Sequence, residues 1–187
     1  VWPHDPAKLV KALQVGLPPT IQIKQVAPAS ADFHARKSAW GPRYTYRILQ
    51  GVASPFEQRY VLSYLRPQPL DTTSMRDAAA VLRGKQFFTG FAADNGTEVF
   101  DPLRNMRRLE VVEDGDRVTL IFEADGFLYK MARSLTGALI AVGEGRMSID
   151  EIRETLRTFR RTERVETAPA QGLFLEEVFY EPVDAPA

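Results

Sequence analysis

The sequence predicts an α+β domain whose mainly antiparallel sheet is covered by helices. Segments rich in aromatic and β-branched residues, typical of strands, occur at 44–49, 106–114 and 117–125. Segments with helix-capping residues lie before and after them without a strict strand–helix–strand repeat, which favours an antiparallel sheet over a parallel one. With 187 residues, of which 44% are hydrophobic, the chain is long enough to bury its own core.

Four helices are expected, three from their capping signals and one, at 125–145, from its apolar helical pattern. Asp5 stands where an N-cap belongs, directly before Pro6 at the first helical position. Ser148 and Glu151 have the spacing of a capping box. The four expected segments are residues 4–16, 71–84, 125–145 and 148–159.

Six strands are expected from alternation or from β-branched and aromatic content. The pair at 106–114 and 117–125 flanks the sequence DGD, whose glycine tolerates the positive φ of a tight hairpin turn. This hairpin is the clearest strand pair in the sequence. The expected strands are residues 21–27, 44–49, 59–65, 106–114, 117–125 and 173–180.

Composition excludes several classes of function. Lys plus Arg and Asp plus Glu both number 24, so the net charge is zero and any nucleic-acid binding must come from local patches. The absence of cysteine excludes disulfides, thiolate nucleophiles and cysteine-containing zinc sites. The only histidines are His4 and His34, so we expect no metal.

The chain also lacks the signals of export and of membrane insertion. No apolar run reaches the roughly 18 residues that a membrane span needs. No signal-like segment opens the sequence, which begins at Val1. We therefore expect a protein that is not secreted and does not enter a membrane, located in the cytoplasm or in an organelle such as a mitochondrion or plastid.

Seven short motifs follow one another along almost the whole chain. They are LP at 17–18, DFHARKSA at 32–39, RYTYRI at 43–48, GKQFFTGF at 84–91, DPLRNM at 101–106, GFLYKMARSLTGAL at 126–139 and TAPAQGLFL at 167–175. In this order they resemble the C-terminal part of the A-type tRNA pseudouridine synthases, the TruA family. The resemblance implies a pseudouridine-synthase-like fold over residues 1–181, followed by a tail at 182–187.

The resemblance also implies a reaction. Enzymes of this family isomerise uridine to pseudouridine in the anticodon stem-loop of tRNA: the N1 glycosidic bond breaks, the uracil turns and its C5 joins the ribose. An aspartate is the essential group, and neither cofactor nor metal takes part. We therefore expect RNA, in particular tRNA, as the partner.

Two residues inherit catalytic roles from this resemblance. Arg133 matches a helix arginine that pairs with the catalytic aspartate, and a planar, always charged guanidinium is suited to that task. Tyr44 matches a tyrosine that stacks on the target uridine and assists proton movement at C5. From the residues alone two simpler interpretations stay open: a structural arginine paired with a carboxylate of its own sheet, and a tyrosine that only covers a sheet face.

Four further cations are candidates for RNA contact under the same resemblance. Arg36 lies in the FHAR segment, Arg43 begins the RYTYRI strand, Arg104 lies in the basic DPLRNM stretch, and Lys130 is near the start of the helix with Arg133. The basic runs at 104–108 and 157–164 could equally be solvated faces.

The family motif R-T-D-x-G-V-H-A, which carries the catalytic aspartate, does not occur in the sequence. We therefore expect the aspartate-bearing N-terminal portion to lie outside this chain, and the chain alone to be inactive. Polar positions within the matched motifs also differ from the family pattern. Phe87 stands where aspartate is usual, and Gly90 replaces a serine.

Two functions follow from this combination. In the first, the chain is the RNA-binding C-terminal portion of a tRNA pseudouridine synthase that an N-terminal portion completes. In the second, it is a catalytically inactive scaffold protein of an organellar ribonucleoprotein or ribosome. Expected partners are accordingly RNA, an N-terminal fragment or a second copy in a homodimer, and in the scaffold case a large ribonucleoprotein.

Overall fold

A computed structural model describes residues 5–94, 96 and 101–182. The chain forms two compact units, an N-terminal unit, Val1–Ser38, and a C-terminal unit, Ala39–Ala187. The boundary between these units lies between Ser38 and Ala39. The expectation of one domain over residues 1–181 stays a prediction. Most of the expected tail at 182–187, and His4, lie outside the described residues.

The N-terminal unit contains one helix, α1 (Pro6–Val15), which begins as expected with the Asp5 side chain accepting a hydrogen bond from the backbone N–H of Ala7. The strand expected at 21–27 is wrong. The Gln14 side chain donates to the carbonyl of Ile21 and accepts from the N–H of Ile23, both at 2.8 Å. The described backbone there pairs with no other strand, and alternation alone does not make a strand without a partner.

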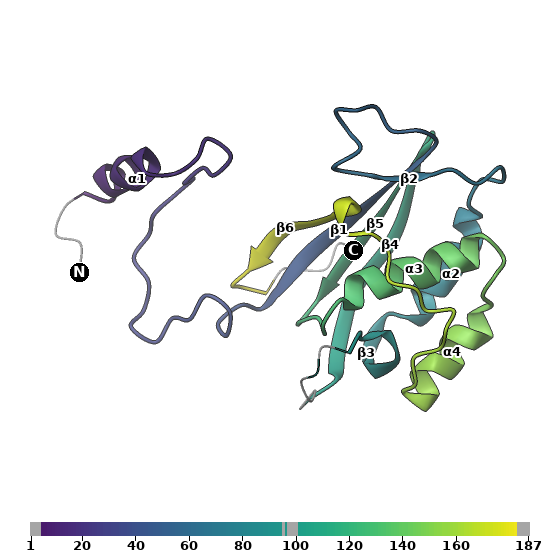
Figure 1. Ribbon diagram of the computed structural model, residues 1–187. Helices are drawn as coiled ribbons and strands as arrows, with labels where there is room; N and C mark the ends of the chain where they lie inside the picture. The colour runs from purple at the N-terminus through teal and green to yellow at the C-terminus, as the bar shows by residue number, and fades with distance from the viewer. Residues whose placement is uncertain (1–4, 95, 97–100, 183–187) are drawn as a thin grey trace. The chain divides into compact units, whose positions relative to one another are not determined.

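The C-terminal unit is built on a six-stranded sheet in the order β2-β1-β5-β4-β3, with β6 also paired to β1 (Figure 1). Every pairing is antiparallel except that of β1 with β2. The predicted α+β class with a mainly antiparallel sheet is therefore confirmed. The strands are β1 (Gly41–Gln50), β2 (Leu62–Tyr64), β3 (Gly84–Phe87), β4 (Leu103–Asp114), β5 (Arg117–Ala124) and β6 (Leu173–Phe179).

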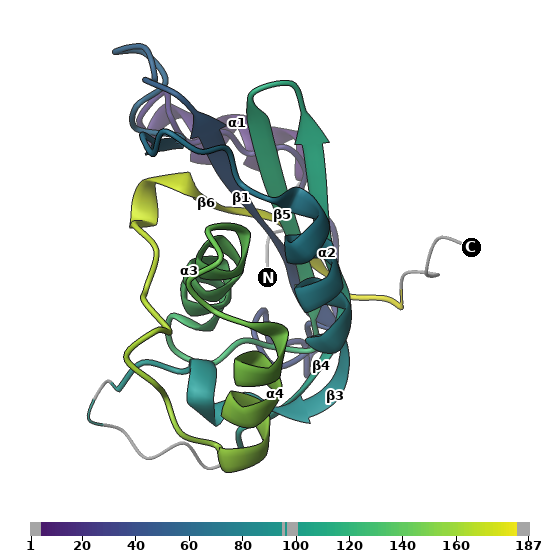
Figure 2. The same cartoon turned by 90° about the vertical axis from the view of Figure 1, so that its right-hand side faces the viewer.

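Three helices cover one face of this sheet, as Figure 2 shows: α2 (Thr72–Val81), α3 (Met131–Gly143) and α4 (Ile149–Thr158). Side chains of alternating strand residues point toward these helices and are fully or almost fully buried. α3 is buried along nearly its whole length, which explains its apolar sequence. The sheet residues of this core include Tyr46, Ile48, Leu109, Val111, Leu120 and Phe122.

The opposite sheet face carries ion pairs. Glu123, only 7% exposed, accepts from Arg43 at 2.7 Å and from Arg108 at 3.1 Å. Arg47 pairs with Glu176 and lies over the ring of Phe174. The sheet therefore separates an apolar, helix-covered face from a face of paired charges.

Two strands differ from the sequence prediction. The strand expected at 59–65 is shortened to Leu62–Tyr64, because the N–H groups of Gln58 and Tyr60 are bonded within turns, to the carbonyls of Ser54 and Glu57. β3 (Gly84–Phe87) was not expected as a strand, although its residues begin the GKQFFTGF motif, and it pairs with the first residues of β4. The predicted hairpin is confirmed as β4 and β5, with Gly115 at φ +59°.

Candidate active site

Tyr44 stands on the helix-covered face of β1. Its cross-strand neighbour on β5 is Phe122, and successive strand residues alternate between faces, so Tyr44 shares a face with buried Tyr46. Tyr44 is half-buried, and its ring meets that of Phe127 edge to face with 5.0 Å between centroids. Phe127 belongs to the segment between β5 and α3, so this contact joins the strand to the start of the helix.

Arg133 lies in the first turn of α3 and is half-buried. Its Nε donates to the carbonyl oxygen of Ala168 at 2.6 Å, and the N–H of Ala168 donates back to the Arg133 carbonyl at 3.1 Å. Within the described residues no carboxylate forms an ion pair with Arg133, so the interpretation of a structural arginine paired on its own sheet finds no partner there. The terminal nitrogens of its guanidinium remain available for an anionic group.

Tyr46 links the strand to Arg133. Its hydroxyl donates to the carbonyl of Pro169 at 2.8 Å, one residue beyond the Ala168 carbonyl that binds Arg133. Burial raises the pKa of the Tyr46 phenol well above its usual value, and the nearby Arg133 cation partly opposes this shift. Tyr46 is therefore a neutral donor at physiological pH. Tyr44 and Arg133 thus both belong to the helix-covered side of the sheet.

The segment 165–169, called here the crossing segment, passes over α3 at Gly137. A Cβ atom on Gly137 would stand 2.1 Å from the carbonyl oxygen of Glu166, far inside any van der Waals contact. Only glycine leaves room for this approach. Gly172 plays the same part farther on, because a Cβ there would stand 2.8 Å from the Tyr46 ring.

Lys130 caps α3 in a left-handed conformation, with φ +55°. A non-glycine residue in this region costs about 1–2 kcal/mol, so the turn is held by its surroundings. The side chain is exposed, and its Nζ lies 5.0 Å from the centre of the Tyr129 ring. The structure thus places this predicted RNA-contact residue three positions before Arg133, at the exposed edge of the same helix end.

Arg104 lies beside the segment between β5 and α3. A Cβ on Gly126 would stand 3.4 Å from the Arg104 Nε, so the two are in close contact. Arg104 donates through Nη1 to the carbonyl of Asp101 at 2.9 Å, whereas its buried Nε has no hydrogen-bond partner in the described part of the chain. Arg104 therefore belongs to the surroundings of the residues between β5 and α3.

Arg43 is not brought to this place. Arg43 points to the opposite sheet face, where it pairs with Glu123 at 2.7 Å and with Glu177 at 3.3 Å. Arg36 is an exposed residue of the N-terminal unit, where its N–H donates to the His34 Nδ1 at 3.2 Å. The roles that the sequence suggested for Arg36 and Arg43 stay predictions.

The two basic runs are largely committed to partners within the chain. In the first, Arg107 lies 3.3 Å over the Trp40 ring and donates to the Ala124 carbonyl, while Arg108 pairs with Glu110. In the second, Arg157 forms two hydrogen bonds with Glu154 on the preceding turn. A run of cations in the sequence is here mostly a set of intramolecular contacts.

Two positions that depart from the family pattern pack against α4 or against Phe159 at its C-terminal end. Phe87 is 45% exposed and meets the ring of Phe159 edge to face at 5.4 Å. A Cβ on Gly90 would stand 2.6 Å from the Thr155 methyl group, so a serine would not fit without movement. Both substitutions agree with the position of α4.

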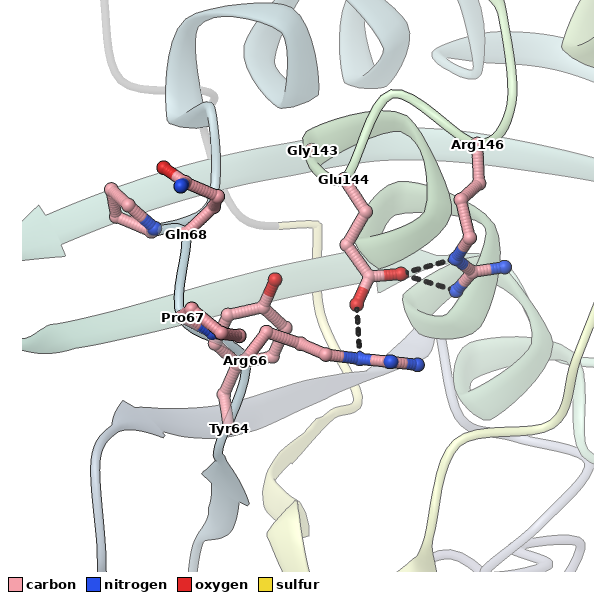
Figure 3. Close-up of a pocket in the computed structure, with 8 residues that line it drawn as sticks. Tyr64, Arg66, Pro67, Gln68, Gly143, Glu144 and Arg146 are labelled. Carbon is pink, nitrogen blue, oxygen red and sulfur yellow. Dashed lines mark hydrogen bonds and ion pairs between the residues drawn. The ribbon is translucent and has the colours of Figure 1, made fainter.

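A pocket of about 270 Å³ lies between the loop after β2 and the end of α3 (Figure 3). Its centre is Glu144, whose side chain is 10% exposed and pairs with both Arg66 and Arg146. Burial and the neighbouring Glu144 carboxylate raise the pKa of the Tyr64 phenol. The charges of this pocket are satisfied among themselves, so it supports no ligand assignment.

Sequence reasoning missed two parts of the candidate site. Phe127, which orients Tyr44, left only a weak signal as one aromatic residue of the GFLY stretch. The Ala168 carbonyl left no signal in the sequence, because every residue has a backbone carbonyl and no residue type marks the one that accepts this hydrogen bond. Among residues 5–94, 96 and 101–182, no group of three acidic or histidine side chains could hold a metal ion. No helix of the described chain has the length and apolar character to cross a membrane.

Comparison with known proteins gives one consistent result. A family model described as tRNA pseudouridine synthase matches residues 78–181. The chain is 37% identical over 180 residues to tRNA pseudouridine synthase A of Lactobacillus delbrueckii subsp. bulgaricus, covering 95% of this chain and 68% of the relative. It is 37% identical to tRNA pseudouridine synthase A 1 of Protochlamydia amoebophila, with 95% and 70% covered. For tRNA pseudouridine synthase A of Listeria innocua, identity is 38%, with 93% and 70% covered.

Proposed function

The chain belongs to the tRNA pseudouridine synthase family, and from that premise we propose that it is the RNA-binding C-terminal portion of an enzyme that converts uridine to pseudouridine in the anticodon stem-loop of tRNA. In this proposal a second, N-terminal portion supplies the catalytic aspartate, which the sequence of this chain does not carry in the family motif. The chain spans about 70% of the length of the relatives it matches, which leaves room for that portion.

The observation that carries the proposal is the state of Arg133. The Nε of its guanidinium donates to the Ala168 carbonyl at 2.6 Å, and the described residues offer no carboxylate to the two terminal nitrogens. Leaving a half-buried cation without a counter-charge is costly unless another group pairs with it. A carboxylate delivered from outside the described residues would satisfy the guanidinium through paired hydrogen bonds.

Tyr44 is suited to hold the base. A uridine removed from its stack needs a flat surface in place of its neighbours, and the half-exposed Tyr44 ring, which meets the Phe127 ring edge to face, is an aromatic surface of this kind. Buried Tyr46 is held neutral and bonded to Pro169, so it serves the framework. Tyr44 is therefore the tyrosine that we assign to stacking and to proton movement at C5.

The reaction balances without an added reagent. The bond between uracil N1 and ribose C1′ breaks, the base rotates, and a bond forms between C5 and C1′. The proton on C5 leaves and N1 gains one. In this chemistry Arg133 keeps the incoming aspartate ionised and oriented, which is the task for which a guanidinium is preferred over an ammonium.

Lys130 and Arg104 are the cations that we assign to the RNA backbone near the target base. Lys130 is exposed at the start of α3, and the Arg104 side chain lies against Gly126 in the segment before that helix. Phosphate contact requires only cations at the correct distance, and two such contacts would position the strand without reading its sequence.

The test is reconstitution. The chain is combined with an aspartate-bearing N-terminal portion of a relative, and release of tritium from C5 of uridine is measured on an anticodon stem-loop RNA. We expect release from the complex, none from either portion alone, and none when the supplied aspartate is changed to asparagine. A folded, stoichiometric complex that binds the RNA and releases no tritium would refute the proposal.

A non-catalytic scaffold protein remains the second candidate, favoured by one observation. Phe87 and Phe159 form an exposed aromatic pair where the family pattern has an aspartate, and an exposed apolar pair suits a partner contact. This candidate requires stoichiometric co-purification with a large ribonucleoprotein. Recovery of the chain with an aspartate-bearing polypeptide instead would favour the enzyme.

A further inference from the structure

Arg161 joins three separate parts of the C-terminal unit. Its Nη1 donates to the hydroxyl of Ser134 at 2.8 Å and to the carbonyl of Ala92 at 3.3 Å. Its Nη2 donates to the Thr167 hydroxyl at 2.9 Å and to the carbonyl of Val165. One guanidinium thus connects α3, the crossing segment and the residue that follows the short helix η1 (Thr89–Phe91).

Together with the Arg133–Ala168 hydrogen bond, these contacts form a closed ring in which Arg133 is one member. Ser134 is the next residue after Arg133, and Thr167 is the residue before Ala168, whose carbonyl holds the Arg133 Nε. The Ser134 and Thr167 hydroxyls lie 3.4 Å apart. Arg161 therefore connects both neighbours of the Arg133–Ala168 pair.

The same contacts indicate that Arg161 has a structural role and does not serve as an RNA-binding cation. A guanidinium has five N–H donors, and the four contacts use Nη1 and Nη2. All four acceptors are uncharged, and partial burial lowers the pKa of the Arg161 guanidinium. The preceding residue differs in its contacts: the Arg160 side chain forms no hydrogen bond or ion pair within the described residues.

We propose that Arg161 is a positioning residue for Arg133, which holds the crossing segment against α3 so that the Ala168 carbonyl fixes the guanidinium in the orientation that receives the aspartate. The holding itself depends only on the contacts of this chain. Its consequence for catalysis rests on the proposed function above. The role is distinct from RNA binding, because it predicts a local loss of order at Ala168 and Arg133 and no change in RNA affinity.

The first experiment needs no activity. Hydrogen exchange is measured by NMR in the 187-residue chain for Arg161→Gln and for the matched control Arg160→Gln, which removes the same charge one position away. We expect Arg161→Gln to accelerate exchange of the Ala168 amide and of the Arg133 Nε–H about tenfold or more, while amides of the β4–β5 hairpin keep their rates. Arg160→Gln should leave all these rates unchanged.

Unchanged exchange at Ala168 and Arg133 in Arg161→Gln would overturn the proposal. A uniform acceleration that includes the hairpin would also overturn it, because it would show a general loss of stability. If Arg161→Gln does not fold, Thr167→Val is the second variant, since it removes one acceptor of Arg161 and keeps every charge. It should accelerate exchange at Ala168 and spare the hairpin, and failure to do so would count equally against the proposal.

The second experiment measures catalysis in the completed enzyme. Arg161→Gln is expected to lower the single-turnover rate of pseudouridine formation about tenfold and to leave the Kd for the stem-loop RNA unchanged, with Arg160→Gln as control. Accelerated exchange with a normal single-turnover rate would overturn the positioning role. An inactive wild-type complex together with the expected exchange pattern would refute the proposed function and leave the holding of Arg133 by Arg161 intact.

Discussion

Arg133 and Ala168 bond to each other in both directions, the arginine Nε to the alanine carbonyl at 2.6 Å and the alanine N–H to the arginine carbonyl at 3.1 Å. The two residues are 35 positions apart in the chain. These two hydrogen bonds fix the start of α3 against the crossing segment and set the direction of the guanidinium. In the sequence Arg133 is only a cation on a helix. In the structure it is a half-buried group held by backbone hydrogen bonds, and its terminal nitrogens have no partner among the described residues.

Replacement of Arg133 by lysine should separate catalysis from folding. Lysine keeps the charge but lacks both the Nε–H that reaches Ala168 and the fork that binds a carboxylate. We expect the single-turnover rate of the completed enzyme to fall roughly 100-fold or more, as for other lost charge-stabilising groups, and stability to fall by about 1 kcal/mol. Arg157→Lys, at an exposed arginine paired with Glu154, should change neither quantity. A fully active Arg133→Lys enzyme would contradict the assigned role.

Replacement of Gly137 by alanine should destabilise the chain, although alanine is the better helix former. The propensity gain is about 1 kcal/mol, but the added Cβ would stand 2.1 Å from the Glu166 carbonyl oxygen. Displacing that backbone should cost about 1–3 kcal/mol or more, so we expect a net loss in the free energy of unfolding by urea titration. Gly16→Ala, where no atom lies within 4 Å, is the control and should be neutral or stabilising. A stabilised Gly137→Ala chain would show that the crossing segment moves freely.

The sequence was sufficient for the elements whose signals are local. Asp5 and Ser148 cap their helices as predicted, and the DGD turn lies where the hairpin needs it. The strand expected at 21–27 failed because alternation does not say whether a second strand is present. β3 was missed because its four residues pair with β4 through tertiary contacts.

The candidate site divides in the same way. Arg133 and Tyr44 could be predicted as candidates because they belong to motifs with a resemblance to a known family. The Ala168 carbonyl and the four acceptors of Arg161 could not be found, because they are backbone or hydroxyl groups brought together by the path of residues 165–169. Arg43 shows the limit of the motif itself, since its neighbouring position on a strand sends its side chain to the other face.

Thr45→Val should reduce stability in a pH-dependent way. The Thr45 hydroxyl donates to Glu176 at 2.7 Å, and this bond, more than Arg47, lowers the pKa of the Glu176 carboxyl. A lowered folded-state pKa contributes stability above the unfolded value of about 4.3, and the contribution is lost as pH falls through the folded pKa. We expect Thr45→Val to cost about 1 kcal/mol at pH 7 and clearly less near pH 3, measured by urea unfolding at both values. An equal loss at both pH values would show that packing, and not the ionised carboxylate, is responsible.

Lys130→Gln should weaken RNA binding to the same extent whatever the base sequence of the RNA. Lys130 is exposed, and its left-handed backbone already accepts a long side chain, so glutamine keeps the turn and removes only the charge. A lost phosphate contact lowers the salt dependence of binding by about one unit in the slope of log K against log salt. We expect this change in the completed enzyme, measured by fluorescence anisotropy with stem-loops of different loop sequence, and the same weakening for each. Lys85→Gln, an exposed lysine on β3, is the matched control. An equal loss for Lys85→Gln would show that the RNA responds to the charge of the whole surface, and an unchanged slope for Lys130→Gln would remove Lys130 from the RNA interface.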